Sequence, residues 1–217
     1  MTNPASVVFH FDFISPYSYL ASQLLSRSPY DAMSVDCRPV VFGSMLSKLG
    51  VKGPGEIPAR RRAGLMDVLL LADRYDIPLE GPPTHPFNPI YALRSVCAVE
   101  AEDARRRLTD RYFRAAWAER KDLSNPEVLR ALALEVDIDH DPEAIASDRN
   151  IRQQLKKQTQ ALLEKGGWGV PTFLVNDVLL FGHERIDMAR DLAVGETRPN
   201  LTKLQALLER PQPGRVV

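Results

Sequence analysis

The sequence predicts an α/β domain whose sheet is interrupted by a long all-helical insertion. Two observations indicate this. Short apolar runs of strand length lie toward the two ends of the chain, at residues 7–13 and 35–42 and again at 171–181. Between them, residues 46–149 carry patterns in which apolar residues recur every three or four positions, as in amphipathic helices. We therefore expect one folding unit with two lobes.

The N-terminal run predicts a buried strand followed by a capped helix. Residues 7–13 are mostly apolar, as in a strand buried within a sheet. Ser15 and Pro16 follow. A serine can accept hydrogen bonds from the free amides of a first helical turn, and a proline at the first helical position loses no hydrogen bond. Ser15 is therefore predicted to be the N-cap of a helix that ends near Arg27.

The middle of the chain predicts one more strand and then only helices. Residues 35–42 predict the strand, and Pro39 places it toward a sheet edge because proline cannot donate to a ladder. The helices are predicted, in chain order, at residues 58–75, at 89–120 with a break near Glu102 and Asp103, from Pro126, and from about Asn150.

The C-terminal part predicts a hairpin and a last helix. The apolar runs 171–175 and 178–181 are separated by Asn176 and Asp177, a pair typical of a tight hairpin turn. After the hairpin we expect a helix over residues 186–193, with an extension after Pro199 left open, and a frayed tail over residues 210–217.

This order of elements is that of a thioredoxin-like domain with a helical insertion. Strand, helix and strand come first, then the helical block, then helix, hairpin and helix. We assign residues 1–45 and 150–217 to the thioredoxin-like domain and residues 46–149 to the all-helical insertion domain.

Composition favours a small-molecule partner. Twenty-eight basic residues balance 28 acidic ones, so no net field attracts nucleic acid or an anionic membrane surface. The sequence predicts neither a signal peptide nor a membrane span, and we expect a cytoplasmic protein. Cys37 and Cys97 lie in apolar surroundings, where buried free thiols are the common state.

Two charged clusters are expected to have no catalytic role. Three aspartates between Asp137 and Asp141 have the alternating spacing of a calcium loop, but Pro142 occupies the position that needs glycine, so we expect no metal site. The arginines from Arg105 to Arg114 are expected on the solvent-exposed face of a helix.

Ser15 is nevertheless the predicted reaction centre. The free N–H groups and the positive end of the helix dipole converge on an N-cap, so that position stabilises an anion. A thiolate is such an anion, and a helix N-terminus lowers the pKa of a thiol below its free value of about 8.5. Ser15 would donate a hydrogen bond, and a ligand would supply the sulfur. A plain helix cap explains the same residue without any chemistry.

The second predicted site element is the turn Gly169-Val170-Pro171. A cis Val170–Pro171 bond would expose the Val170 backbone, so that an extended peptide-like thiol such as glutathione could pair with it. Pro171 could equally begin an edge strand. Trp168 beside this turn either borders a ligand cleft or packs in the core.

These elements carry a family resemblance. Residues 11–21, 169–173 and 181–185 resemble the corresponding segments of the 2-hydroxychromene-2-carboxylate isomerases. The kappa-class glutathione transferases are similar, and both are related to the disulfide oxidoreductase DsbA. The resemblance implies that Ser15 stands where DsbA has its reactive cysteine and bonds the sulfur of glutathione. No thiol remains between Ser15 and Ser18 for disulfide exchange.

The resemblance also implies roles for other residues. The Val170 backbone would hold the cysteinyl part of glutathione, and the segment Phe181, Gly182, His183 and Glu184 would meet its γ-glutamyl end. Lys48, with Ser47 beside it, would attract the carboxylate of the substrate. Two departures from the family pattern concern recognition: Glu184 stands where many relatives have aspartate, and the asparagine that commonly follows the lysine is absent here.

The leading hypothesis is a glutathione-dependent isomerase of the 2-hydroxychromene-2-carboxylate type, an enzyme of aromatic compound breakdown that acts on a small aromatic carboxylate. A kappa-like glutathione transferase or peroxidase and a non-catalytic thiol-peptide binding protein are the alternatives. We also expect a homodimer.

Overall fold

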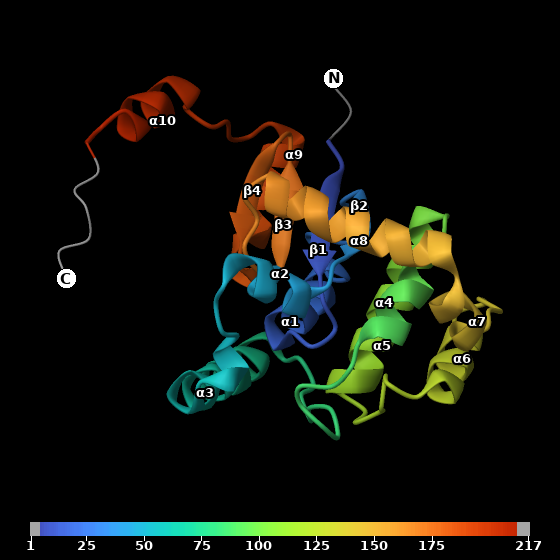
Figure 1. Cartoon of the computed structure of the whole chain (residues 1–217). Helices are drawn as coiled ribbons and strands as arrows, with labels where there is room; N and C mark the ends of the chain where they lie inside the picture. The colour runs from blue at the N-terminus through green and yellow to red at the C-terminus, as the bar shows by residue number, and fades with distance from the viewer. Residues whose placement is uncertain (1–4, 212–217) are drawn as a thin grey trace.

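The computed structural model describes residues 5–211. In chain order its elements are β1 (Val7–Phe11), α1 (Pro16–Leu25), β2 (Val35–Pro39), α2 (Phe42–Leu49), the 3₁₀ turn η1 (Pro54–Glu56), α3 (Pro58–Tyr75), α4 (Ile90–Cys97), α5 (Glu102–Trp117), α6 (Pro126–Leu134), α7 (Pro142–Ser147), α8 (Arg149–Glu164), β3 (Thr172–Val175), β4 (Val178–Phe181), the 3₁₀ turn η2 (His183–Arg185), α9 (Ile186–Val194) and α10 (Leu201–Leu208). Figure 1 shows their arrangement.

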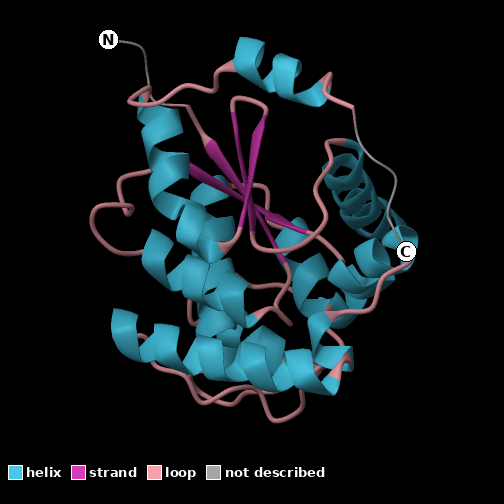
Figure 2. Ribbon diagram, turned by 90° about the vertical axis from the view of Figure 1, so that its left-hand side faces the viewer, coloured by secondary structure: helices cyan, strands magenta, loops and turns pink. Residues whose placement is uncertain are grey.

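One mixed sheet joins the two ends of the chain. Its strand order is β2-β1-β3-β4, and Figure 2 shows the strands crossing the middle of the molecule among the helices. β1 pairs with β2 in parallel and with β3 antiparallel, so that Phe9 lies opposite both Cys37 and Phe173. The parallel pair is connected through α1, because parallel strands need a long crossover. β2 is an edge strand, as Pro39 predicts.

The predicted hairpin between β3 and β4 is confirmed. Asn176 and Asp177 join the strands and both have positive φ, 47° and 64°. Two left-handed residues in succession form the tight turn whose twist matches that of the flanking strands.

Aromatic side chains form the centre of the core. The rings of Phe9 and Phe173 stack across the β1–β3 pair with centroids 5.5 Å apart. Further along β1, Phe11 and Phe13 both contact Phe113 of α5, at 5.4 and 4.7 Å. All five side chains are fully buried, and they connect the sheet to the helical part of the chain.

Most predicted helices are confirmed, whereas the stretch after β2 differs from expectation. The predicted strand 35–42 ends at Pro39, and α2 begins at Phe42. No side chain of the local sequence caps α2. Its first amides donate instead to groups that are distant in the sequence. The N–H of Val41 donates to Thr159 Oγ1 at 3.0 Å, and the N–H of Phe42 donates to Asp12 Oδ2 at 2.9 Å. This helix start is therefore a tertiary feature. The short helix α7 was also not predicted.

The domain division stays a prediction. Its first boundary, between residues 45 and 46, falls within α2, and its second falls at the first turn of α8. The expected frayed tail is described only as far as residue 211, so residues 212–217 lie outside the described part of the chain. α10, with its leucines exposed, extends away from the sheet at the top left of Figure 1.

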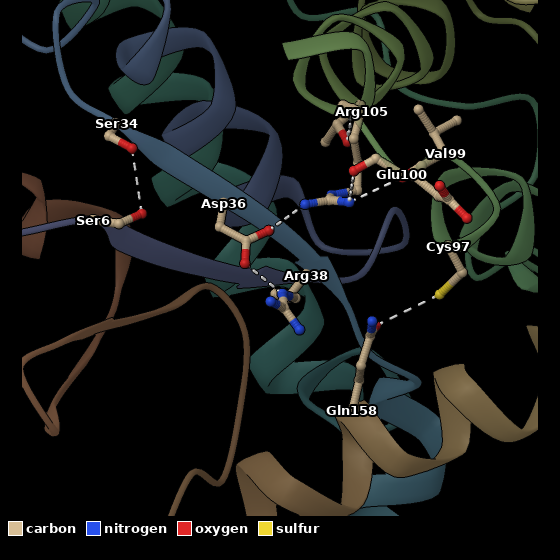
Figure 3. A network of polar contacts seen from close by, with 10 residues as sticks. Ser6, Ser34, Asp36, Arg38, Cys97, Val99, Glu100, Arg105 and Gln158 are labelled. Carbon is tan, nitrogen blue, oxygen red and sulfur yellow. Dashed lines mark hydrogen bonds and ion pairs between the residues drawn. The ribbon is translucent and has the colours of Figure 1, made fainter. Parts of the chain in front are cut away.

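The expectation of a solvent-exposed arginine face on α5 is wrong for Arg105 and Arg106. Arg105 donates to Asp36 Oδ1 of β2 at 2.6 Å and to the carbonyls of the α4–α5 turn (Figure 3). Arg106 donates to the carbonyl of Met33 at 3.0 Å. Backbone carbonyls and the Asp36 carboxylate accept hydrogen bonds from these guanidinium groups, which therefore lie against the protein. The buried Nε of Arg105 has no partner within residues 5–211.

We expect Asp36→Ala to lower the free energy of unfolding by about 2 to 4 kcal/mol, because it leaves the nearly buried guanidinium of Arg105 without its carboxylate. The Asp36 and Arg105 side chains are only 7% and 13% exposed. Arg38 also pairs with Asp36, but its side chain is 44% exposed, so Arg38→Ala should cost less than about 1 kcal/mol. Urea unfolding of both variants measures the difference. Equal losses would contradict this account.

Candidate active site

The turn between β1 and α1 fixes the position of Ser15. The Ser15 N–H donates to the carbonyl of Asp12 at 3.0 Å, which closes the turn. Ser15 Oγ accepts the N–H of Ser18 at 3.1 Å and donates to the carbonyl of Val170 at 3.4 Å. The predicted N-cap is thus confirmed, and its hydroxyl bridges the first turn of α1 and the turn before β3. Ser15 is 6% exposed.

A buried carboxylate lies under this turn. Asp12 is fully buried and accepts the N–H of Ile14 at 3.2 Å and of Phe42 at 2.9 Å. Burial raises the pKa of Asp12 to about 7, although the backbone N–H donors act in the opposite direction. Within residues 5–211 no cation pairs with this carboxylate. Its negative charge therefore depends on backbone amides alone.

The cis bond expected at Val170–Pro171 is present. The carbonyl of Val170 accepts a hydrogen bond from the Ser15 hydroxyl, and the N–H of Val170 has no hydrogen-bond partner within residues 5–211. Thr172 Oγ1 donates to the carbonyl of Gly169 at 2.8 Å and holds the turn together. An unpaired N–H at this position can receive an extended ligand backbone.

A cavity of about 430 Å³ opens beside this turn, and this volume is ample for a tripeptide-sized ligand. Its lining residues come from α1, α3, the Val170–Pro171 turn and the segment after β4: Tyr17, Asp67, Leu71, Arg74, Tyr75, Val170, Pro171, Phe181, Gly182, His183 and Glu184. All five residues predicted to bind the cofactor are among them. Ser15 reaches this cavity wall through its hydrogen bond to Val170.

Aromatic rings enclose the imidazole of His183. The ring of Tyr17 stacks on it with centroids 5.6 Å apart, and the ring of Tyr75 meets it edge-on at 6.2 Å. His183 Nδ1 lies 3.4 Å from Glu184 Oε2. Desolvation by burial lowers the pKa of His183 more than the nearby carboxylates of Glu184 and Asp67 raise it. Burial therefore favours the neutral form of the imidazole.

Gly182 lets Glu184 fold back over the chain. Gly182 has φ +109°, and a Cβ at this position would overlap the Glu184 carboxylate. Its N–H donates to the carbonyl of Pro171 at 3.0 Å, which places the segment after β4 next to the cis turn. Only glycine accommodates both the positive φ and the close carboxylate.

Trp168 is not a core residue. Its side chain is 56% exposed, and it packs on Phe181 with ring centroids 3.8 Å apart. Of the two roles considered from the sequence, core packing is wrong. Trp168 instead covers the outer side of Phe181, one of the cavity residues.

The contribution of α3 to the cavity was not predicted. Tyr17 Oη donates to Asp67 Oδ2 at 2.7 Å and ties α1 to α3. Asp67, Leu71 and Arg74 line the cavity at spacings of four and three residues, which places them on one helix face. The sequence signal was this mixed polar stripe, but nothing local indicates which face of α3 meets a ligand.

Ser47 and Lys48 do not line the cavity. Both lie on the exposed side of α2, and the Lys48 ammonium donates to the side-chain carbonyl of Gln160 on α8. The opposite side of α2 carries Met45, which is buried in a small cluster with Val170. α2 therefore packs behind the cis turn, and the substrate roles of Ser47 and Lys48 stay predictions.

Residues 5–211 contain neither a candidate metal site nor a helix suited to span a membrane. No group of three or more histidine, cysteine, aspartate or glutamate side chains is placed to hold a metal ion. In this same range, no helix has the length and apolar character needed to cross a membrane.

Comparison with known proteins places the chain among DsbA relatives. The family model described as DSBA-like thioredoxin domain matches residues 6–193. The 2-hydroxychromene-2-carboxylate isomerase of Sphingobium xenophagum is 27% identical over 187 residues, covering 84% of this chain and 94% of the relative. Glutathione S-transferase kappa 1 of Homo sapiens is 24% identical over 206 residues, covering 87% and 91%.

Solved structures agree with these relatives. The structure of a 2-hydroxychromene-2-carboxylate isomerase superposes with a TM-score of 0.77 at 26% identity, covering 94% of this chain and 99% of the other. The cytosolic disulfide reductase DsbM of Pseudomonas aeruginosa, solved with GSH, has a TM-score of 0.62 at 18% identity, covers 92% and 99%, and shows the fold alone. The predicted thioredoxin-like fold and the family resemblance are confirmed.

We expect Asp12 to make stability fall with rising pH. The unfolded carboxyl loses its proton near its ordinary pKa of 3.8, whereas the folded one keeps it until about pH 7. Between these values the folded state binds more protons, so the free energy of unfolding decreases as pH rises.

Asp12→Asn should remove this decrease. Urea unfolding at several pH values between 4 and 8 measures it, and the wild-type minus variant difference cancels the titration of the other groups, His183 included. Parallel pH profiles for the two proteins would show that the pKa of Asp12 is the same in the folded and unfolded states and that this assignment is wrong.

Proposed function

The chain belongs to the DSBA-like thioredoxin domain family, and from this premise we propose that it is a glutathione-dependent isomerase of the 2-hydroxychromene-2-carboxylate type. Relatives of this name are 27% identical to it across most of both chains. The observation that carries the proposal is the Ser15 hydroxyl, which caps α1 and bonds the backbone of the cis turn beside the cavity. In this proposal the Ser15 hydroxyl releases its long bond to the Val170 carbonyl and donates its single proton to a sulfur that the protein itself does not supply.

The cysteines of the chain cannot provide that sulfur. Cys37 and Cys97 are both buried and free, and burial raises the pKa of each thiol to about 12. Neither is a thiolate at neutral pH, and neither lines the cavity. A thiol cofactor is therefore required for any thiolate chemistry at Ser15.

The cavity fits glutathione in size and in chemistry. The unpaired Val170 N–H suits the backbone of a cysteinyl residue, which places the thiol within reach of the Ser15 hydroxyl. Carboxylates of Glu184 and Asp67 suit the ammonium of the γ-glutamyl end. In this proposal Val170, Phe181, Gly182, His183 and Glu184 hold the cofactor.

Ser15 and the start of α1 stabilise negative charge. The first-turn amides and the Ser15 hydroxyl lower the pKa of a thiol placed at this helix end. When bound, glutathione supplies a nucleophile that adds to a conjugated carbon and leaves again, which allows a bond to rotate between addition and departure. The protein contributes orientation of the reactants and exclusion of water by the helical part of the chain.

We assign the substrate carboxylate to the exposed side of α2. Lys48 offers a cation there, with the Ser47 hydroxyl beside it, and Gln160 is the only hydrogen-bond partner of the Lys48 ammonium within residues 5–211. An anionic aromatic substrate would displace a single neutral partner. The proposed compartment is the cytoplasm, where glutathione is held reduced.

A kappa-like transferase is the second candidate, because glutathione S-transferase kappa 1 of Homo sapiens is also similar along most of its length. The two activities differ in the fate of glutathione. Mass analysis of the product separates them, since net incorporation of glutathione would replace the isomerase proposal by the transferase.

We expect Ser15→Ala to raise the pKa of the bound glutathione thiol by about 1 to 2 and to lower kcat/KM about 100-fold, because one donor to the anion is lost. Ultraviolet thiolate absorbance during glutathione titration, with turnover of 2-hydroxychromene-2-carboxylate, measures both. Ser26→Ala, at the other end of α1, is the matched control and should change neither. An equal thiolate signal in wild type and Ser15→Ala refutes the mechanism.

Lys48→Met should raise the KM for 2-hydroxychromene-2-carboxylate about threefold to fivefold, since an exposed ion pair is lost, and leave glutathione affinity unchanged. Lys52→Met, an exposed lysine outside α2, is the control. Steady-state kinetics at low ionic strength measures the effect. If both variants keep the wild-type KM, Lys48 has no part in substrate binding.

A further inference from the structure

Arg74 is a charged residue in the lining of the cavity. It lies in the last turn of α3 and lines the cavity, and its side chain has no hydrogen bond or ion pair within residues 5–211. Arginines elsewhere in the structure, such as Arg105 and Arg111, donate to carboxylates or carbonyls of the protein. A guanidinium facing a cavity without a protein partner is available for a planar anion, and it binds carboxylates through two parallel hydrogen bonds.

Two sets of hydrogen bonds hold α3 on either side of Arg74. Toward the start of the helix, Asp67 accepts the Tyr17 hydroxyl at 2.7 Å. At its end, the guanidinium of Arg27 donates to the carbonyls of Tyr75 at 2.6 Å and Asp76 at 2.9 Å. Arg74 lies between these two sets of hydrogen bonds, roughly 10 Å along the axis of α3 from Asp67 and next to Tyr75. The first set attaches α3 to α1, the helix that Ser15 caps, and the second attaches α3 to Arg27, which lies just after the end of α1.

The end of α3 faces the segment that carries Glu184. The ring of Tyr75 meets the His183 imidazole at 6.2 Å, and the Glu184 carboxylate lies 3.4 Å from the same imidazole. Arg74 and Glu184 line the same cavity and carry opposite charges. The Glu184 side chain is 51% exposed, and its contact with Arg185 is long, at 3.7 Å. The carboxylate is open to a cation from the cavity.

Opposite charges on two walls suit a zwitterion. An α-amino acid group carries an ammonium and a carboxylate on one carbon, and in glutathione only the γ-glutamyl end has this pair. A simple anion would gain from Arg74 but be repelled by Glu184 and Asp67. A simple cation would be attracted by Glu184 and Asp67 but repelled by Arg74.

We propose that Arg74 binds the α-carboxylate at the γ-glutamyl end of glutathione while Glu184 binds the ammonium on the same carbon. This inference rests on the proposed function, since it names a contact within the same cofactor site. It makes α3, a helix of the insertion, a determinant of cofactor specificity.

Calorimetric titration with three peptides tests the contact. The probes are glutathione, 4-aminobutyryl-cysteinyl-glycine, which lacks only the γ-glutamyl α-carboxylate, and the glycyl ethyl ester of glutathione. Wild-type protein should bind the aminobutyryl peptide about tenfold more weakly than glutathione and the ester with little change. Arg74→Gln should lose about tenfold for glutathione and nothing further for the aminobutyryl peptide.

The controls distinguish failure of the Arg74 contact from failure of the proposed function. Arg62→Gln, an exposed arginine on the same helix that does not line the cavity, should bind all three probes like wild type. Unchanged melting of Arg74→Gln excludes a folding defect. If Arg74→Gln loses affinity equally for glutathione and the aminobutyryl peptide, or if its loss disappears with the ester, the assignment is wrong. If wild type binds no glutathione, the proposed function fails first.

Discussion

Two oxygen-bearing groups of Asp12 organise the end of β1. Its carbonyl accepts the N–H of Ser15, and its carboxylate accepts the N–H groups of Ile14 and Phe42. Within residues 5–211 no cation pairs with this fully buried carboxylate, and it is tolerated because these amides satisfy it. The same three hydrogen bonds join the residue that follows β1 to the starts of α1 and α2. The direction of the Ser15 hydroxyl toward Val170 follows from this turn.

The cavity beside Ser15 is assembled from parts that differ in how they are held. The Val170 turn and Gly182 belong to the sheet end, where strand pairing and close backbone contacts fix their positions. α3 presents an exposed outer surface, and hydrogen bonds from Tyr17 of α1 and from Arg27, which follows α1, attach it to the rest of the chain. Sequence changes on the cavity face of α3 can therefore alter the cavity lining without changing the turn that holds Ser15.

Charge at this site is controlled by burial more than by ion pairs. Burial raises the pKa of Asp12 to about 7, and it lowers the pKa of His183. Each shift favours the neutral form of the side chain. The positive end of α1 then has little competing charge from the residues around it, and an anion placed at Ser15 experiences the helix end directly. This arrangement suits a site whose anion comes from a ligand.

Elements with local signals were predictable from the sequence: the N-cap at Ser15, the hairpin turn at Asn176 and the helix over residues 58–75. Caps and turn pairs act through neighbouring residues, so they can be recognised in one dimension. The sequence leaves the cis bond before Pro171 open, because an edge strand accounts for the same proline. The start of α2, the engagement of the α5 arginines and the face of α3 that lines the cavity became clear only in three dimensions. Those depend on partners far away in the chain, as the bond from Phe42 to a carboxylate 30 residues earlier illustrates.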